Sequence, residues 1–213
     1  MFLSRLTLDL RDRAVRHDLA NPYELHRTIL RAFPDAQAGG PGRVLFRVEL
    51  PRAGVEVVLV QSDQEPLWGR LPTGYLAAHQ TKPLAGLAFR AGQRLSFRLR
   101  ANPTKRAGKS TPDAHWIGKR VGLCREVDQE GWLSRKGEVG GFRVTPESFR
   151  LIPEGKVLAR KGGQSLQFQA VRFEGVLTVT DPERFLQTLR DGIGSAKGLG
   201  FGLLSVAPAE GLP

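Results

Sequence analysis

The order of strand-like and helix-like segments constrains the fold of this chain more than any other feature of the sequence. Residues 2–10 alternate between apolar and polar side chains, which is typical of a strand with one buried face. Asn21, Pro22 and Glu24 then resemble the cap, first position and third position of a helix. That helix is expected to run to about Phe33 and to stop at the following proline.

Alternation and short apolar runs predict three further strands in the first half, at residues 44–50, 57–60 and 94–101. Residues 11–20 are charged and are predicted as a loop, and a short helix is expected near residues 73–79. The resulting order, β-α-β-β-α-β, is the ferredoxin-like pattern. Residues 1–102 are therefore assigned to a first domain that carries the helix described above.

Residues 103–117 form a polar and basic break, which is expected to link two domains. The segments beyond it predict strands at 119–123, 142–152, 157–179 and 201–206, helices at 125–136 and 181–191, and a turn at 153–155. This is a second βαββαβ order, without a sequence period, so residues 118–213 are assigned to a second domain. The predicted fold class is α+β, with two tandem ferredoxin-like (βαββαβ) domains and antiparallel sheets.

The charge balance indicates a polyanionic partner. The chain of 213 residues has 32 Lys and Arg against 21 Asp and Glu, a net charge of +11, which favours nucleic acid or an acidic membrane surface. No apolar run is long enough for a membrane helix, and the N-terminus meets charge too early for a secretory signal. The single cysteine, Cys124, excludes an internal disulfide and favours a reducing, cytoplasmic location. We predict no metal and no other cofactor, because no paired metal-ligand spacing is present among His17, His26, His79 and His115.

The helix that begins at Asn21 carries the first candidate for chemistry. At about 100° per residue, Tyr23, His26 and Arg27 fall on one face, opposite the apolar face that can pack on a sheet. The helix N-terminus suits a phosphate, and its field helps to keep His26 neutral, as a general base requires. A lone histidine beside an apolar face can equally be structural.

A glycine-rich segment, residues 192–202, lies between a predicted helix and a predicted strand. Glycines let backbone N–H groups approach a phosphate closely, and Lys197 adds positive charge. The segment matches neither a P-loop nor a dinucleotide-binding fingerprint. A tight turn between helix and strand would explain it equally well.

Basic side chains also gather around the predicted strands and the break between domains. They are Arg94, Arg98 and Arg100 on one strand face, Lys105, Arg106, Lys109, Lys119 and Arg120 beside the break, and Arg160 and Lys161 near a Gly-Gly turn. A hairpin tip at that turn could enter a wide nucleic-acid groove. Any one of these side chains can be an ordinary solvated charge, but the net charge argues that some of them bind a polyanion.

Five strings in this chain, taken in order, resemble one family. They are Tyr23-Glu24-Leu25-His26, Phe97-Arg98-Leu99-Arg100-Ala101-Asn102-Pro103 with Lys105, Gly118-Lys119-Arg120-Val121, Phe173-Glu174-Gly175-Val176-Leu177, and Gly192-Ile193-Gly194 through Gly202-Leu203-Leu204-Ser205. Together they are similar to the CasE family, the CRISPR repeat-processing endoribonucleases of type I-E systems, within a wider superfamily of repeat-associated RNA-binding proteins.

The resemblance implies two tandem ferredoxin-like domains and cleavage of precursor CRISPR RNA at the 3′ base of the repeat stem-loop. It implies retention of the product within the Cascade complex, whose other subunits are the expected partners. It makes Tyr23 and His26 the catalytic pair, and it implies RNA contacts by the glycine-rich loop and by a basic hairpin. With the basic residues above, the predicted RNA-binding set is Arg27, Arg31, Arg98, Arg100, Lys105, Lys119, Arg120, Arg160, Lys161, Lys197, Gly198 and Gly200.

The expected reaction needs no metal: a base removes the proton of the 2′-hydroxyl beside the scissile phosphate, and an acid protonates the leaving 5′-oxygen. We assign His26 as the base and Tyr23 as the acid or as the group that orients the hydroxyl, with the reverse assignment left open. Arg27, Arg31 and Lys197 are candidates to stabilise the phosphorane. Two alternatives are a non-catalytic RNA-binding subunit and a nucleotide-binding enzyme that uses residues 192–202.

Overall fold

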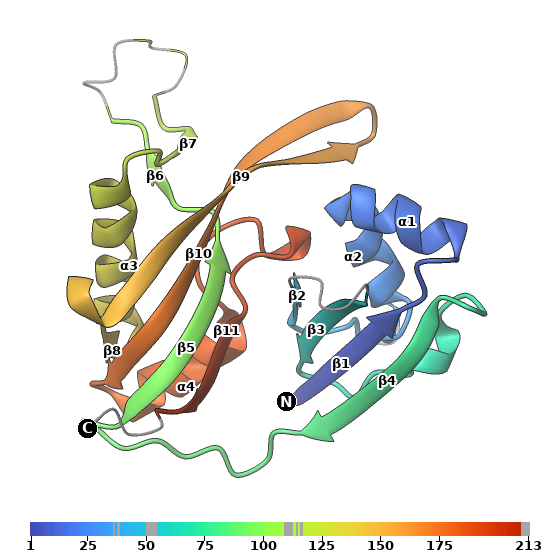
Figure 1. The fold of residues 1–213 in the computed structure, drawn as a ribbon, viewed down its shortest axis with the longest axis horizontal. Coiled ribbons are helices and arrows are strands. Elements are labelled where there is room, and N and C mark those ends of the chain that lie inside the picture. Colours follow the sequence, from blue (N-terminus) through green and yellow to red (C-terminus); the bar gives the residue numbers. More distant parts are fainter. Residues whose placement is uncertain are drawn as a thin grey trace.

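The first of two antiparallel sheets lies in the N-terminal part of the computed structural model, which describes residues 1–35, 37, 39–49, 55–108, 113, 115 and 117–209. Its elements are β1 (Phe2–Leu8), α1 (Arg13–Ala20), α2 (Pro22–Leu30), β2 (Val44–Val48), β3 (Glu56–Ser62), a 3₁₀ turn (Trp68–Arg70) and β4 (Leu76–Pro83). The strand order is β2-β3-β1-β4 (Figure 1). The apolar faces of the strands and of α2 share one core, which includes Leu6, Leu25, Phe46 and Val58.

The second sheet belongs to the C-terminal part. Its elements are β5 (Arg94–Ala101), α3 (Glu126–Gly140), β8 (Phe142–Arg143), a 3₁₀ turn (Pro146–Ser148), β9 (Phe149–Lys161), β10 (Gln164–Val179), α4 (Pro182–Asp191), a 3₁₀ turn (Lys197–Leu199) and β11 (Leu204–Pro208). The order is β11-β5-β10-β8, with β9 also paired to β10, while β6 (Thr104–Arg106) and β7 (Arg120–Gly122) form a separate ribbon. In both sheets the first strand lies between the third and the fourth, as in ferredoxin-like domains, so the predicted fold class is confirmed.

The assignment of residues 94–101 to the first sheet is wrong. They form β5, which pairs with β10 and β11 in the second sheet, whereas β4 closes the first. The chain therefore passes from one sheet to the other between Pro83 and Arg94, not through residues 103–117. An alternating pattern shows that one face of a strand is buried, but it does not show which hydrophobic core that face packs against. Leu99 and its apolar neighbours pack in the core of the second sheet.

Local expectations also need correction. Residues 11–20 contain α1, which Asp12 caps through its side chain and whose Val15 is buried, so a charged segment is helical here. Residues 73–79 contain no helix, because β4 begins at Leu76. Helix α2 ends at Leu30, before Phe33. Residues 119–123 contribute β7 to the separate ribbon and not a first strand to the second sheet.

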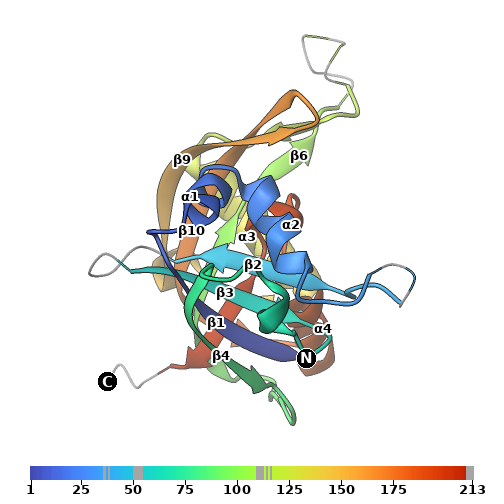
Figure 2. The same cartoon turned by 90° about the vertical axis from the view of Figure 1, so that its right-hand side faces the viewer.

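The turn expected at residues 153–155 is a β-bulge inside β9. Pro153 faces Val171 and Gly155 faces Ala170 on β10, so Glu154 is the extra residue, and Gly155 has φ of +80°. The hairpin turns at Gly162 and Gly163, which are the residues that suggested a tip. Beyond the bulge the β9–β10 hairpin projects from the second sheet toward α1 and α2 (Figures 1 and 2).

No helix in the part of the chain that the structure describes is long and apolar enough to cross a membrane. The basic candidate Lys109 lies outside the described residues.

Candidate active site

Helix α2 is held rigidly against the first sheet. Its Leu25 and Ile29 are buried in the core. The buried carboxylate of Asp18, on α1, accepts hydrogen bonds from Thr28 Oγ1 at 2.6 Å and from Tyr75 Oη at 2.8 Å. Apolar packing and a satisfied buried carboxylate together fix the rotation of the helix. Tyr23 and His26, which lie one turn apart and are half-buried, are positioned by that rotation.

The imidazole of His26 lies between the first sheet and the glycine-rich loop. Its ring stacks on Phe46 of β2, with centroids 5.9 Å apart and planes at 14°. A Cβ on Gly198 would lie 3.1 Å from His26 Nε2, so the missing side chain at this position gives the ring its space. Burial lowers the pKa of His26 below its usual value, because the imidazolium loses water there. The side chain is therefore neutral at neutral pH.

The other ring nitrogen of His26 is unusual. Among the buried side-chain nitrogen and oxygen atoms of the described residues, Nδ1 of His26 alone has no hydrogen-bond partner. Such a group costs about 1–3 kcal/mol when it is left unsatisfied. Buried polar atoms without a partner are uncommon in folded proteins, and each calls for a structural or functional reason.

The β9–β10 hairpin reaches the beginning of α2. Lys161 Nζ lies 5.5 Å from the centroid of the Tyr23 ring, within the range of a cation–π contact. The side chain of Asn21 exchanges two hydrogen bonds of 3.1 Å with the backbone of Arg160: its Nδ2 donates to the carbonyl oxygen, and its Oδ1 accepts from the N–H. The hairpin is thereby in contact with the helix that carries Tyr23 and His26.

The glycine-rich loop packs against the first domain. Gly200 has φ of +81°, and a Cβ there would lie 3.2 Å from the ring of Phe46. Lys197 Nζ donates to the carbonyl oxygen of Asp191, the last residue of α4, at 2.6 Å. Burial lowers the pKa of Lys197, and repulsion from Arg43 and Lys136 adds to that effect. The structure thus gives this lysine a partner at the end of a helix, where a cation is favourable.

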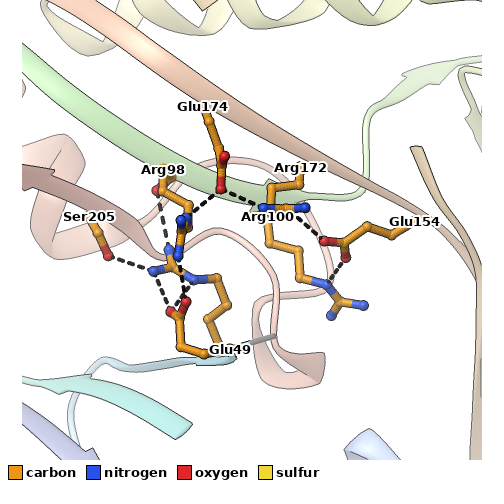
Figure 3. A network of polar contacts seen from close by, with 8 residues as sticks. Glu49, Arg98, Arg100, Glu154, Arg172, Glu174 and Ser205 are labelled. Atoms are coloured by element: carbon orange, nitrogen blue, oxygen red, sulfur yellow. Dashed lines mark hydrogen bonds and ion pairs between the residues drawn. The ribbon is translucent and has the colours of Figure 1, made fainter. Parts of the chain in front are cut away.

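A chain of alternating arginines and glutamates crosses from the first domain to the second (Figure 3). Arg47 of β2 is only 3% exposed, and its five N–H donors are directed at Glu49, Ser205 Oγ and the carbonyl oxygens of Arg98 and Leu203. The ion pairs continue in the order Glu49–Arg98, Arg98–Glu174, Glu174–Arg172, Arg172–Glu154 and Glu154–Arg100.

Arg98 and Arg100 stand at different places in this chain. Arg98 is paired with two carboxylates, so its charge is neutralised within the protein. Arg100 bonds to Glu154 through Nε only, and its guanidinium carbon lies 4.7 Å from the centroid of the Phe201 ring in the glycine-rich loop. Within the described ranges its two terminal nitrogens have no hydrogen-bond partner, and Figure 3 shows them pointing away from the network.

The other predicted RNA-binding residues fall into three places. Arg27 pairs with Glu24 on the surface of α2, and Arg31 is exposed where that helix ends. Arg160 and Lys161 belong to the hairpin. Lys105, Lys119 and Arg120 lie on or beside the β6–β7 ribbon, at the same end of the second domain as the hairpin in both views (Figures 1 and 2).

The chain matches the CRISPR associated protein family over residues 1–208. It belongs to this family. It is 45% identical over 221 residues to the CRISPR-associated endoribonuclease Cse3 of Thermus thermophilus, covering 98% of this chain and all of the relative. It is 34% identical to the CRISPR system Cascade subunit CasE of Escherichia coli, again over 98% of this chain and all of the relative.

A solved structure of this family supports the same conclusion. The structure of CRISPR endoribonuclease Cse3 bound to 19 nt RNA superposes with a TM-score of 0.87 and 44% identity, covering 98% of this chain and all of that chain. The resemblance to the CasE family that the sequence indicated is therefore confirmed. The roles of individual residues in this family member stay predictions.

Sequence reasoning missed Phe46, which supports the His26 ring, and Glu154, which holds Arg100. Phe46 alternates like any core residue of a strand, so its pattern carries no sign of the site. Glu154 faces Arg100 because it is the extra residue of a bulge, and the sequence at residues 153–155 predicts a turn there instead. Asn21 was recognised as a helix cap, but its contact with Arg160, 139 residues away, has no local signal.

No group of three or more His, Cys, Asp or Glu side chains in the described part of the chain could hold a metal ion.

Proposed function

We propose that this family member is a metal-independent endoribonuclease that cuts precursor CRISPR RNA at the 3′ base of the repeat stem-loop. After cleavage it retains the mature RNA as a subunit of Cascade. The relatives named above support the substrate class and the assembly. The observation that carries the proposal is the placement of His26: a half-buried, neutral imidazole beside the glycine-rich loop, one turn after Tyr23.

The proposed step is an internal transesterification. The 2′-hydroxyl beside the scissile phosphate gives its proton to a base, and its oxygen forms a new bond to phosphorus. The bond from phosphorus to the 5′-oxygen breaks, and an acid supplies the proton for that oxygen. The products are a 2′,3′-cyclic phosphate and a 5′-hydroxyl.

His26 is assigned as the base because burial favours its neutral form. Tyr23 is assigned as the acid or as the group that orients the 2′-hydroxyl. The cation of Lys161 over its ring and the cap at Asn21 would hold the phenol in place. A well-placed acid or base contributes about 10²–10⁴-fold to the rate.

Three arginines are candidates to stabilise negative charge on the phosphorane: Arg27, Arg31 and Arg100. The terminal nitrogens of Arg100 are oriented for this task because Glu154 and Phe201 fix the rest of the side chain. Lys197 is a weaker candidate, since its amine already bonds to the end of α4. Gly198 and Gly200 contribute mainly by the room they leave for His26 and Phe46.

The stem of the RNA is assigned to the basic hairpin and the neighbouring ribbon. Arg160 and Lys161 at the hairpin tip would contact the stem. Lys105, Lys119 and Arg120 would contact phosphates alongside it. On the ribbon Arg106 lies directly opposite Arg120, and facing like charges destabilise a strand pair unless an anion lies between them. Among these residues Arg98 is the weakest candidate for an RNA contact, because its guanidinium is already paired with Glu49 and Glu174.

The deciding experiment incubates the purified protein with its repeat hairpin RNA in EDTA and analyses the ends of the fragments. We expect one cut at the 3′ base of the stem, with a cyclic phosphate and a 5′-hydroxyl. A hairpin with a 2′-deoxy nucleotide before the scissile bond should bind and stay intact. Cleavage of that deoxy hairpin would refute the proposed nucleophile, and binding without any cleavage would favour a non-catalytic RNA-binding subunit.

The proposed place of action is the cytoplasm. The proposed substrate is a transcript, and the only cysteine, Cys124, is a free thiol compatible with a reducing compartment.

A further inference from the structure

We propose that Asn21 is a positioning residue that holds the RNA-binding hairpin in register with α2. It thereby sets which phosphodiester bond reaches Tyr23 and His26. The inference rests on the function proposed above and concerns a residue outside the predicted site. Its basis is the pair of hydrogen bonds between the Asn21 side chain and the backbone of Arg160, which we call the Asn21 clasp.

The clasp uses backbone groups that the hairpin leaves free. Arg160 faces Ser165 across the hairpin, one pair back from the two-residue turn at Gly162 and Gly163. In such a hairpin the pair next to the turn is hydrogen-bonded and the following pair is not. The N–H and C=O of Arg160 therefore point away from β10, and the carboxamide of Asn21 meets both of them as another peptide group would.

The same residue begins the catalytic helix. Asn21 Oδ1 also accepts from the N–H of Tyr23, at 3.4 Å, and its own N–H donates to the carbonyl oxygen of Asp18. Next to the clasp, Lys161 lies over the Tyr23 ring. The tip of the hairpin and the first turn of α2 are thus joined by two adjacent contacts, Arg160 to Asn21 and Lys161 to Tyr23.

Nearer its base the hairpin is also held by Phe168, whose ring centroid lies 6.2 Å from that of Phe201, and by the N–H of Gln169, which donates to Asn102 Oδ1. The clasp and the adjacent Lys161–Tyr23 contact are what position its tip. Beyond the bulge at Glu154, the pairs from Gly155–Ala170 to Lys161–Gln164 have only each other as strand partners. A two-stranded ribbon on its own is marginally stable. An RNA stem bound to the tip would otherwise be free to shift relative to α2, and misplacement of reacting groups by about 1 Å can reduce a rate about 100-fold.

Helix capping alone does not require asparagine here. Ser and Asp cap helices about as well as Asn. Asp181 also caps a helix before a proline, α4 before Pro182, by accepting from the N–H of Arg184 where Asn21 accepts from that of Tyr23. Serine is too short for the clasp, and aspartate has no N–H to donate. Asn21→Ser therefore separates the two roles, and Asp181→Ser is the matched control for capping.

The test measures the affinity for an uncut 2′-deoxy hairpin, the single-turnover rate at saturating protein, and the position of the cut. For Asn21→Ser we expect a rate about tenfold lower, an affinity within about threefold of wild type and additional cuts at neighbouring phosphates. Asp181→Ser should match wild type in all three.

If wild type cuts and Asn21→Ser cuts at the same rate and position, the inference is wrong and the proposed function stands. A loss of affinity in Asn21→Ser as large as its loss of rate also overturns it, because the clasp would then serve binding alone. If wild type leaves the RNA uncut, the proposed function fails first. Asn21→Asp, which keeps the cap and one of the two hydrogen bonds, should show a smaller loss of rate in the same direction if Asn21→Ser does not fold.

Discussion

The two domains meet at two junctions, and these differ in whether their buried polar groups have hydrogen-bond partners. Where β2 meets the second sheet, Arg47 is almost fully buried and each of its donors has a partner. Where α2 meets the glycine-rich loop, His26 keeps Nδ1 buried and unpaired, and the nearby Arg100 uses only one of its nitrogens. At the first junction every donor of Arg47 has a partner, whereas the second keeps polar atoms that no described residue satisfies. We propose that the first set of contacts holds the domains together and that the second set acts on RNA.

The catalytic junction is tested most severely by His26→Ala. Removing the proposed base should reduce the single-turnover cleavage rate by about 10²–10⁴-fold. Affinity for the repeat hairpin should stay within a fewfold of wild type, because the hairpin and ribbon contacts are untouched. Cleavage at the wild-type rate would mean that the unpaired imidazole has no part in the chemistry.

The structural junction is tested by Arg47→Leu. The carbonyl oxygens of Arg98 and Leu203 and the Ser205 hydroxyl would lose their donor. Breaking a buried ion pair costs about 3–5 kcal/mol in free energy of unfolding, which urea denaturation measures. Arg27→Ala removes the exposed Arg–Glu pair with Glu24 and should change that free energy by less than about 1 kcal/mol. Equal effects of the two substitutions would contradict the contrast between the junctions.

A methyl group at Gly198 probes the contact between the loop and His26. Its Cβ would lie 3.1 Å from Nε2, so the imidazole must shift by a few tenths of an ångström. We expect Gly198→Ala to reduce the cleavage rate about tenfold while the melting temperature stays close to that of wild type. Gly194→Ala is a useful comparison, because its φ of +87° predicts backbone strain, and hence a lower melting temperature, away from His26. If Gly198→Ala cleaves as fast as wild type, the position of the His26 ring does not depend on the missing side chain at position 198.

The smallest expected effect is a change with pH. Burial disfavours the imidazolium, so the pKa of His26 lies below 6.5 in the folded protein. As the base, His26 must be neutral, and kcat/KM should therefore fall on acidification, with a midpoint below the ordinary imidazole pKa of about 6.5. The pH profile of kcat/KM between 4.5 and 8 is the measurement. A rate that rises on acidification would assign His26 as the acid and Tyr23 as the other partner.

The sequence predicted the elements better than their assembly. The cap and first turn of α2 follow from local spacing, and so does the placement of Tyr23 and His26 on one side. Their expected exposure does not follow: both are half-buried, because the hairpin and the glycine-rich loop lie against them. The partners of Arg98 and Arg100 do not, because cross-strand neighbours depend on register between segments far apart in the chain. The same limit explains why β5 was placed in the wrong sheet: alternation marks a buried face without naming its core.

Because of the bulge at Glu154, the number of residues in β9 decides which charged side chains face each side of the strand. Side chains change faces at every step along a strand, and one extra residue resets which of them face each way. If a residue next to the bulge were deleted so that β9 became regular, Glu154 would point to the opposite face of the strand. Its carboxylate would then no longer reach Arg100. A change of length alone, with no change of residue type elsewhere, would thus leave a bare guanidinium beside the glycine-rich loop.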